Sequence, residues 1–149
     1  MTGTLDLDAI DALLTGETIA HLACIRPDGR PYVVPITYAY DGKALYSYSA
    51  DGDKLEALRA NPSACVVVDR ADDAANWVSV IVWGTFHELA DEDAAQALRL
   101  ISTRLRTVAV AETTSPSAER SYVARIGRDG VLYCITIAER TGRYSTSGA

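Results

Sequence analysis

The stretch that decides the fold is Pro31–Pro62, PYVVPITYAYDGKALYSYSADGDKLEALRANP. Residues 32–40 are rich in β-branched and aromatic side chains, which favour strands, and residues 45–49 repeat that composition. Between them, Asp41-Gly42 favours a tight turn, because glycine adopts the positive φ angles that such a turn requires. A helical segment follows around Lys54 and ends at an Asn-Pro pair. The stretch predicts a β-hairpin followed by a short helix.

The start of this predicted helix carries groups that bind anions. Ser49 and Lys54 supply a hydroxyl and a cation, and the first N–H groups of a helix have no partner within it. Such a helix start attracts phosphate. The sequence therefore predicts a phosphate site here, with Tyr48 and Arg59 as further donors.

Hydrophobic periodicity extends the prediction to the rest of the chain. The predicted helices cover residues 8–14, 53–60 and 91–106. The predicted strands cover residues 18–26, 31–40, 43–49, 64–70, 77–89 and 131–138. Asp6 or Asp8 caps the first helix, and Asp53 and Glu56 have the spacing of a capping box. Short antiparallel strands with few helices predict a small barrel in a single domain, residues 1–149.

One segment, residues 107–121, has neither helical nor strand periodicity. It is polar and longer than most connections, which makes it a candidate lid or interface segment. A surface loop without function is an equally good interpretation. The sequence leaves the role of this segment open.

Bulk composition excludes several classes of protein. The net charge of −6 and the lack of a basic face argue against nucleic-acid and anionic-membrane partners. The N-terminus is acidic where a signal peptide is basic, and no apolar run is long enough to span a membrane, so a cytoplasmic location is predicted. Cys24, Cys65 and Cys134 are odd in number and widely spaced, which predicts buried free thiols.

The titratable residues give little sign of acid–base or metal chemistry. His21 and His87 are isolated on predicted strands, so no metal site is expected. No nucleophile elbow or nucleophile–base pair is present, and the catalytic residues are unknown. This absence is compatible with an enzyme whose cofactor carries the chemistry.

The order of the motifs resembles a known family. A strand, a turn, a second strand, the string S-x-x-G-x-K at residues 49–54, a helix ending in L-R-A-N-P and a further strand resemble the pyridoxamine 5'-phosphate oxidase-like FMN-binding split-barrel family, especially its nitroimidazole-resistance-like branch. The string IAHLAC at 19–24 with DGRPY at 28–32 resembles the first hairpin of that branch, and WVSV at 77–80 with Gly84 resembles its fifth strand. The resemblance implies a mainly β fold, a six- to seven-stranded antiparallel split β-barrel with flanking helices.

The resemblance also implies a flavin site. FMN is expected to lie along residues 34–37, where Pro35 removes a ladder donor and so favours an edge strand or a special site. The implied cofactor-binding residues are Val34, Pro35, Ile36, Thr37, Tyr48, Ser49, Lys54, Trp77 and Ser79. Tyr48 replaces a histidine that is usual in the branch, which weakens an inference of nitroimidazole reduction. Asp51 and Asp53 place negative charge beside the phosphate position and are expected to weaken FMN binding.

The implied function is that of an FMN-dependent oxidoreductase. A homodimer would bind flavin at its interface, accept hydride from NADH or NADPH and act on a small-molecule substrate. Trp77, Tyr38 and Tyr40 support a dimer, because a barrel of this size cannot bury all its aromatic strand residues, whereas Trp83 is expected in the core. The alternatives are a non-catalytic flavin-binding or storage module and a haem- or deazaflavin-binding split barrel. The isolated histidines count against haem, and the acids near Lys54 count against the charged deazaflavin tail.

Overall fold

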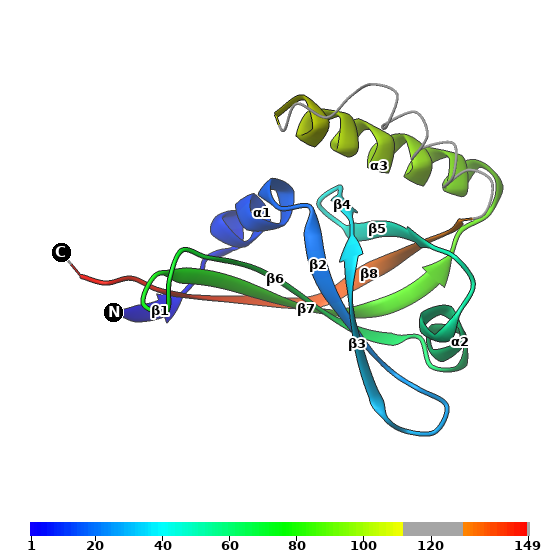
Figure 1. Cartoon of the computed structure of the whole chain (residues 1–149), viewed down its shortest axis with the longest axis horizontal. Helices are drawn as coiled ribbons and strands as arrows, with labels where there is room; N and C mark the ends of the chain where they lie inside the picture. Colours follow the sequence, from blue (N-terminus) through cyan, green and yellow to red (C-terminus); the bar gives the residue numbers. More distant parts are fainter. Residues whose placement is uncertain (112–129, 149) are drawn as a thin grey trace.

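The chain folds into one curled antiparallel sheet flanked by helices (Figure 1). The structure is a computed structural model that describes residues 1–111 and 130–148. The described elements are β1 (Thr2–Thr4), α1 (Leu7–Gly16), β2 (Ile19–Ile25), β3 (Pro31–Thr37), β4 (Ala39–Tyr40), β5 (Ala44–Ser49), α2 (Asp53–Ala60), β6 (Ser63–Ala71), β7 (Trp77–Glu88), α3 (Asp91–Ala111) and β8 (Val131–Ser145). The strand order is β3-β2-β6-β7-β8-β5-β4, and β1 pairs with the end of β8. The predicted mainly β fold, an antiparallel split barrel, is confirmed, although the sheet has eight strands rather than the expected six to seven.

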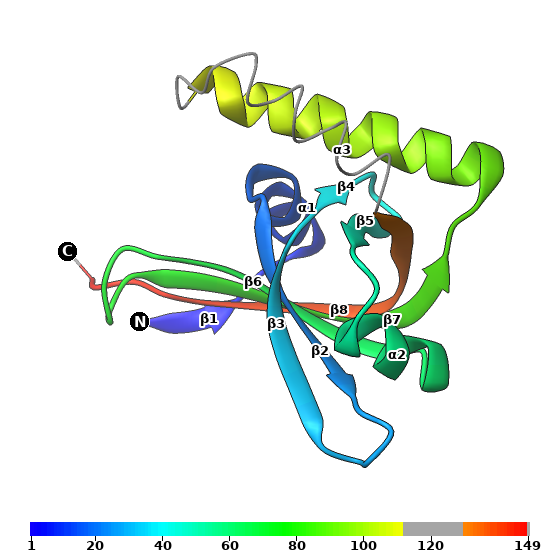
Figure 2. The ribbon, with the colours of Figure 1, turned by 45° about the vertical axis from the view of Figure 1, so that its right-hand side comes forward.

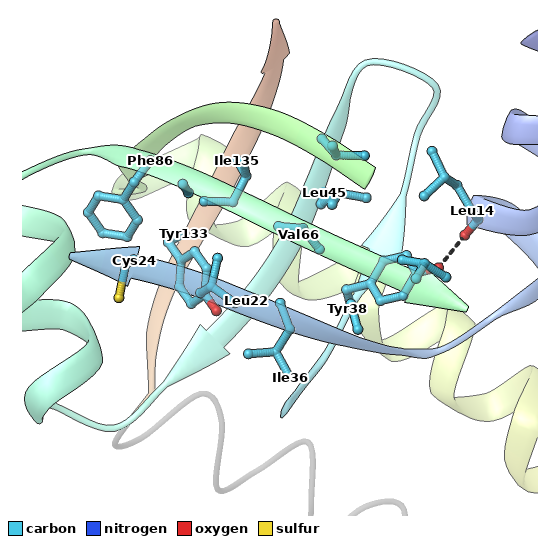
Figure 3. Packing of buried hydrophobic residues seen from close by; sticks show 14 of the residues in the cluster. Leu14, Leu22, Cys24, Ile36, Tyr38, Leu45, Val66, Phe86, Tyr133 and Ile135 are labelled. Atoms are coloured by element: carbon cyan, nitrogen blue, oxygen red, sulfur yellow. Dashed lines mark hydrogen bonds between the residues drawn. The ribbon is translucent and has the colours of Figure 1, made fainter. Parts of the chain in front are cut away.

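The hydrophobic core lies inside the curl of the sheet. Side chains from alternate positions of the strands meet there, and Leu22, Val66, Tyr133 and Ile135 are fully buried (Figure 3). The two ends of the sheet approach each other at β3 and β5, where the Ser47 hydroxyl donates to the Thr37 carbonyl at 2.6 Å. The barrel is therefore closed at this seam by a side chain.

Two helices cover the β4–β5 end of the barrel (Figure 2). Asp6 caps α1 by accepting from the Ala9 N–H at 2.8 Å, which confirms one of the two predicted caps. The Tyr38 hydroxyl donates to the Leu14 carbonyl at 2.7 Å and ties α1 to the barrel (Figure 3). α3 buries Ala97 and Ile101 against a separate cluster formed with β4 and β8.

The start of α2 corrects one prediction. Its N-cap is Gly52, which has no side chain to donate or accept, and no side-chain cap is formed. Asp53 is already the first helical residue, so its carboxylate cannot cap the helix as a capping box requires, and it turns to Arg26 instead. The first N–H groups of α2 are left without a capping side chain.

Several boundaries differ from those predicted. β1 was not predicted, β4 is separated from β3, and β8 continues to Ser145 rather than ending at residue 138. α3 extends to Ala111, so residues 107–111 of the predicted loop are helical, and the rest of that loop, 112–121, lies outside the described residues. The second half of β8 is polar because one of its faces is exposed, and its pairing with β7 and β1 holds it as a strand.

Within the described residues, no helix combines the length and the apolar character needed to cross a membrane.

Candidate functional site

The predicted phosphate position lies where α2 meets the end of β2. Lys54, the second residue of α2, is half-buried, and the Cys24 thiol of β2 lies near enough to interact with it electrostatically. Burial lowers the pKa of Lys54, and the Cys24 side chain partly offsets this effect. Among residues 1–111 and 130–148, no carboxylate pairs with Lys54. This cation at an uncapped helix start is suited to an anionic ligand.

The two acids beside Lys54 are paired with arginines. Arg26 Nη1 lies 3.4 Å from Asp53 Oδ2. Arg59 Nη1 donates to Asp51 Oδ1 at 2.8 Å, and the same guanidinium binds both carboxylate oxygens of Glu88 at 2.8 and 2.9 Å. The repulsion expected from Asp51 and Asp53 is therefore partly offset by neighbouring positive charge. Arg59 itself is engaged by these two carboxylates, so the structure does not place it as a free donor for phosphate.

The predicted flavin strand, β3, divides its residues between two faces. β3 pairs only with β2 in the described sheet, which confirms that Pro35 lies on an edge strand. Pro35 and Thr37 face outward, whereas Ile36 is buried and Val34 packs against the core. Only the backbone of Val34 and Ile36 is available to a ligand outside the barrel.

The outer face of the sheet carries mostly apolar side chains in register across β3, β2, β6 and β7, and polar ones on β8. The strand pairing aligns one row of outward residues, Pro35, His21, Val67, Ile81 and Thr141. It aligns a neighbouring row, Val33, Ala23, Cys65, Trp83 and Glu139. Ala23, Cys65 and Trp83 of the second row line a hollow of about 430 Å³, whose walls also include Pro31, Ser63 and Thr85. We call these two rows and the hollow the outer apolar face.

Trp83 corrects a prediction that placed it in the core. Its side chain points to the outer apolar face and the residue is 40% exposed. Trp77 lies on the same side of β7 and is half-buried. The sequence showed that both tryptophans share a strand face, but the outward direction of that face becomes evident only from the burial of Val80 and Val82 between them.

Trp77 and Ser79 are remote from Lys54 within one chain. α2 leads directly into Ser63 of β6, which pairs with Thr85, whereas Ser79 pairs with Asp69 at the other end of the same hairpin (Figure 1). Ser79 and Thr85 are six residue steps apart, which is roughly 20 Å of extended strand. Lys54 lies near the turn end of β3, because Cys24 beside it pairs with Tyr32, whereas Trp77 and Ser79 lie far from Lys54.

Tyr48 and Ser49 lie at the end of β5, one step before α2. Tyr48 is half-buried and packs against the cluster beneath α3. The Ser49 hydroxyl donates to the Ala50 carbonyl at 2.8 Å. Their predicted contacts with a cofactor stay predictions, and the observed packing of Tyr48 gives it a structural role as well.

Two of the three cysteines predicted to be buried are buried in the structure. Cys24 and Cys134 are buried, Cys65 is half-buried, and all three are free thiols. Burial raises the pKa of each thiol, which favours the protonated thiol over the reactive thiolate. His21 and His87 are exposed, and the described part of the chain contains no cluster of side chains that could hold a metal ion.

A second hollow, of about 450 Å³, lies away from the predicted site. It is enclosed by α1, β4 and α3, and its walls include Leu14, Ala39, Leu100 and Arg104. Arg104 donates to the Gly16 carbonyl at the end of α1 at 2.7 Å. None of the predicted cofactor residues lines this hollow.

The comparison with family models identifies the fold. A model described as pyridoxamine 5'-phosphate oxidase matches residues 6–144, which is nearly the whole chain. The chain belongs to this family. The split barrel is therefore the fold of a pyridoxamine 5'-phosphate oxidase-like chain.

Individual relatives support the same assignment. An FAD-binding protein from Mesorhizobium loti is 30% identical, with a TM-score of 0.73 over 99% of this chain and 98% of its own. A candidate 5-nitroimidazole antibiotic resistance protein from Bacteroides thetaiotaomicron shares the fold, with a TM-score of 0.71, 18% identity and coverage of 97% and 87%. An uncharacterized Rhizobium meliloti protein is 42% identical over 71 residues. The match spans 48% of this chain and 46% of that protein, so it covers about half of each.

Proposed function

We propose that the protein is an FMN-dependent oxidoreductase whose flavin phosphate binds at the start of α2. Family membership and the resemblance at residues 49–54 support this proposal. The observation that carries it is Lys54, a half-buried cation without a carboxylate partner in the described residues, at a helix start without a side-chain cap. These groups fit a phosphate, and the free backbone of the edge strand around Pro35 fits the polar edge of a flavin ring.

The chain's own residues bind and orient the cofactor. Lys54 and the first N–H groups of α2 hold the phosphate, Pro35 and Thr37 flank the ring, and the apolar side chains nearby exclude water. A bound flavin supplies hydride and electron transfer, which explains why no nucleophile or general base is needed from the protein. NADH or NADPH is the proposed donor, and a small molecule is the proposed acceptor.

We further propose that the outer apolar face is the interface of a homodimer that completes the flavin site. Lys54 lies near one end of the β6–β7 hairpin and Ser79 lies at the other end. The two residues can therefore contact the same flavin more readily when they come from different subunits of a dimer. The exposed Val33, Ile19 and Trp83 support such an interface. Tyr38 and Tyr40 were also predicted to lie at a dimer interface, but they give it no support. Tyr38 is buried inside the chain, and the Tyr40 hydroxyl is hydrogen-bonded to Asp11 and Arg140.

The proposal is tested first on the unmodified protein. FMN is added at micromolar concentration, and its fluorescence and the melting temperature of the protein are followed, with FAD and riboflavin in parallel. NADH or NADPH is then mixed anaerobically with the complex, and the flavin absorbance is recorded. Bleaching that is reversed by an acceptor supports the enzyme, whereas an inert bound flavin supports the flavin-storage alternative. If neither FMN nor FAD changes its fluorescence or the melting temperature of the protein, both the enzyme and the flavin-storage alternative are contradicted.

Lys54→Ala is the residue-level test of the phosphate site. Loss of a hydrogen bond to a charged group costs about 1.5–3 kcal/mol, so FMN should bind roughly ten- to hundred-fold more weakly. Riboflavin, which has no phosphate, should bind the variant and the parent equally. Lys43→Ala removes the other lysine of the chain, an exposed residue in the β4–β5 turn, and is the matched control. Equal FMN affinity in all three proteins would make Lys54 an ordinary lysine.

A further inference from the structure

The end of the barrel near α2 holds a second cation that is only loosely bound. Arg26 follows β2 and has a side chain that is 32% exposed. Its Nη1 lies 3.4 Å from Asp53 Oδ2 and its Nε lies 3.9 Å from Asp28 Oδ1. Both distances exceed the usual range for a charge-assisted hydrogen bond. Arg30 is the better partner of Asp28, with contacts of 2.9 Å.

Tyr32 and Asp53 together hold the Arg26 guanidinium at the start of α2. The guanidinium carbon lies 5.7 Å from the centre of the Tyr32 ring, within the range of a cation–π contact. Asp53 is the first residue of α2 and directly precedes Lys54, so this guanidinium lies beside the proposed phosphate position. Arg26 is thus placed near Lys54 without a strong partner of its own.

The charges at this end of the barrel favour an exchange of partners. The Asp53 side chain is 60% exposed, and an ion pair in contact with solvent contributes little. A phosphate group offers two charges and several oxygens, and it accepts the planar fork of a guanidinium in a bidentate manner. A phosphate held by Lys54 would therefore compete effectively with Asp53 for Arg26.

We propose that Arg26 is a second phosphate-binding cation of the flavin site, and that Asp53 occupies it when no phosphate is bound. Arg26 then determines the preference for phosphorylated flavins over riboflavin, and Asp53 limits that preference as an internal competitor. This inference rests on the proposed function.

The first experiment measures the dissociation constants of FMN and riboflavin for Arg26→Gln. Loss of one charge-assisted contact predicts FMN binding weaker by roughly ten-fold. Riboflavin binding should be unchanged. Arg30→Gln is the matched control, because Arg30 belongs to the same turn, is 73% exposed and pairs with Asp28. Its affinity for both flavins should equal that of the parent.

The second experiment separates exchange from simple repulsion with Asp53→Asn in two backgrounds. If Asp53 competes for Arg26, Asp53→Asn tightens FMN binding in the parent but has no effect on FMN in Arg26→Gln. Equal tightening in both backgrounds would show that Asp53 acts on the phosphate directly, and would overturn the exchange. The Asn side chain keeps the size of Asp, so packing at the start of α2 is preserved.

The outcomes distinguish this inference from the proposed function. An unchanged ratio of FMN to riboflavin affinity in Arg26→Gln, with tight FMN binding in the parent, rejects the role of Arg26 alone. If the parent protein binds neither FMN nor FAD, both the role of Arg26 and the proposed function are overturned. If Arg26→Gln does not fold, Arg26→Met replaces it, since it removes the charge but keeps a long side chain. An FMN-specific loss in Arg26→Met supports the role, and equal affinities overturn it.

Discussion

Tyr133 is a buried phenol inside the barrel whose hydroxyl has no hydrogen-bond partner among the described residues (Figure 3). Burial raises its pKa to about 12, and Ser47 opposes this rise. The Ser47 hydroxyl donates to the Thr37 carbonyl at 2.6 Å, and it lies in no hydrogen-bonding geometry with the Tyr133 hydroxyl. A buried polar group without a partner is costly to the folded state.

Tyr133→Phe should therefore raise the free energy of unfolding, on the order of 1 kcal/mol, because it removes an unpaired hydroxyl and keeps the ring. Urea unfolding measures the change. Tyr38→Phe is the control, since it removes a hydroxyl that donates to the Leu14 carbonyl at 2.7 Å, and it should lower stability by about 1 kcal/mol. A similar loss in both variants would show that the Tyr133 hydroxyl is paired in solution.

Single residues also show what the sequence can and cannot predict about the site. The position of Lys54 at the start of α2 was predictable, because a helix start and its second residue are set by local sequence. The partner of Asp53 was not, since Arg26 is 27 residues away. The partner of Asp51, Arg59, is only eight residues away, but Arg59 also binds Glu88, which is 29 residues distant. Without these contacts, Asp51 and Asp53 would be expected to repel a bound phosphate. With them, each acid is bound by an arginine.

At the scale of elements, the β7–β8 pair is irregular at Gly84. The register shifts between Trp83 and Gly84, and Ala138 is the extra residue on β8. β8 comes so close that a Cβ added to Gly84 would lie 2.2 Å from the Thr136 carbonyl oxygen. That atom belongs to backbone and cannot move aside. The glycine permits the close approach that places the two ends of β8 on different parts of the barrel.

Gly84→Ala should destabilise the protein by about 1–3 kcal/mol, because the added methyl group forces the two strands apart. The change is measured by urea unfolding. Gly16→Ala is the matched control: the added atom would meet only Arg70 Nη2, at 3.5 Å, and alanine is the better helix former at the end of α1. It should leave stability unchanged or slightly higher. Equal stability of Gly84→Ala and the parent would contradict the close approach.

Elements were predictable where local pattern and packing agree. The bounds of α2 match those predicted, and the buried face of α1 consists of Ile10, Leu13 and Leu14 as expected. β1 was missed because Thr-Gly-Thr has no periodic pattern and depends on pairing with β8. The end of β8 was missed for a related reason: its strand form is imposed by β7, and alternating hydrophobicity is absent beyond residue 138.

For the whole molecule, the distribution of exposed apolar residues points to one side of the sheet. Ile19, Ile25, Val33 and Trp83 are four of the six large hydrophobic residues described as exposed, and all face outward from β2, β3 and β7. The sequence indicated more apolar residues than the barrel can bury. It did not show which of them are exposed, and the predicted interface residues Tyr38 and Tyr40 are used within the fold. An apolar face of this kind is typical of an interface.

Val33→Asp tests whether the outer apolar face joins two copies of the chain. Val33 is 62% exposed on an edge strand, so the charge should cost the single chain little, but a carboxylate in a dry interface is strongly unfavourable. The parent should sediment as a dimer of the 16.0 kDa chain at micromolar concentration, and the variant as a monomer. FMN affinity should fall with the loss of the dimer if both copies contribute to the flavin site. Leu7→Asp is the matched control, because Leu7 is 61% exposed on α1 and belongs to neither row of the outer apolar face, although it borders Glu139. A monomeric parent, or a Val33→Asp variant that stays dimeric like Leu7→Asp, would place the interface elsewhere or exclude it.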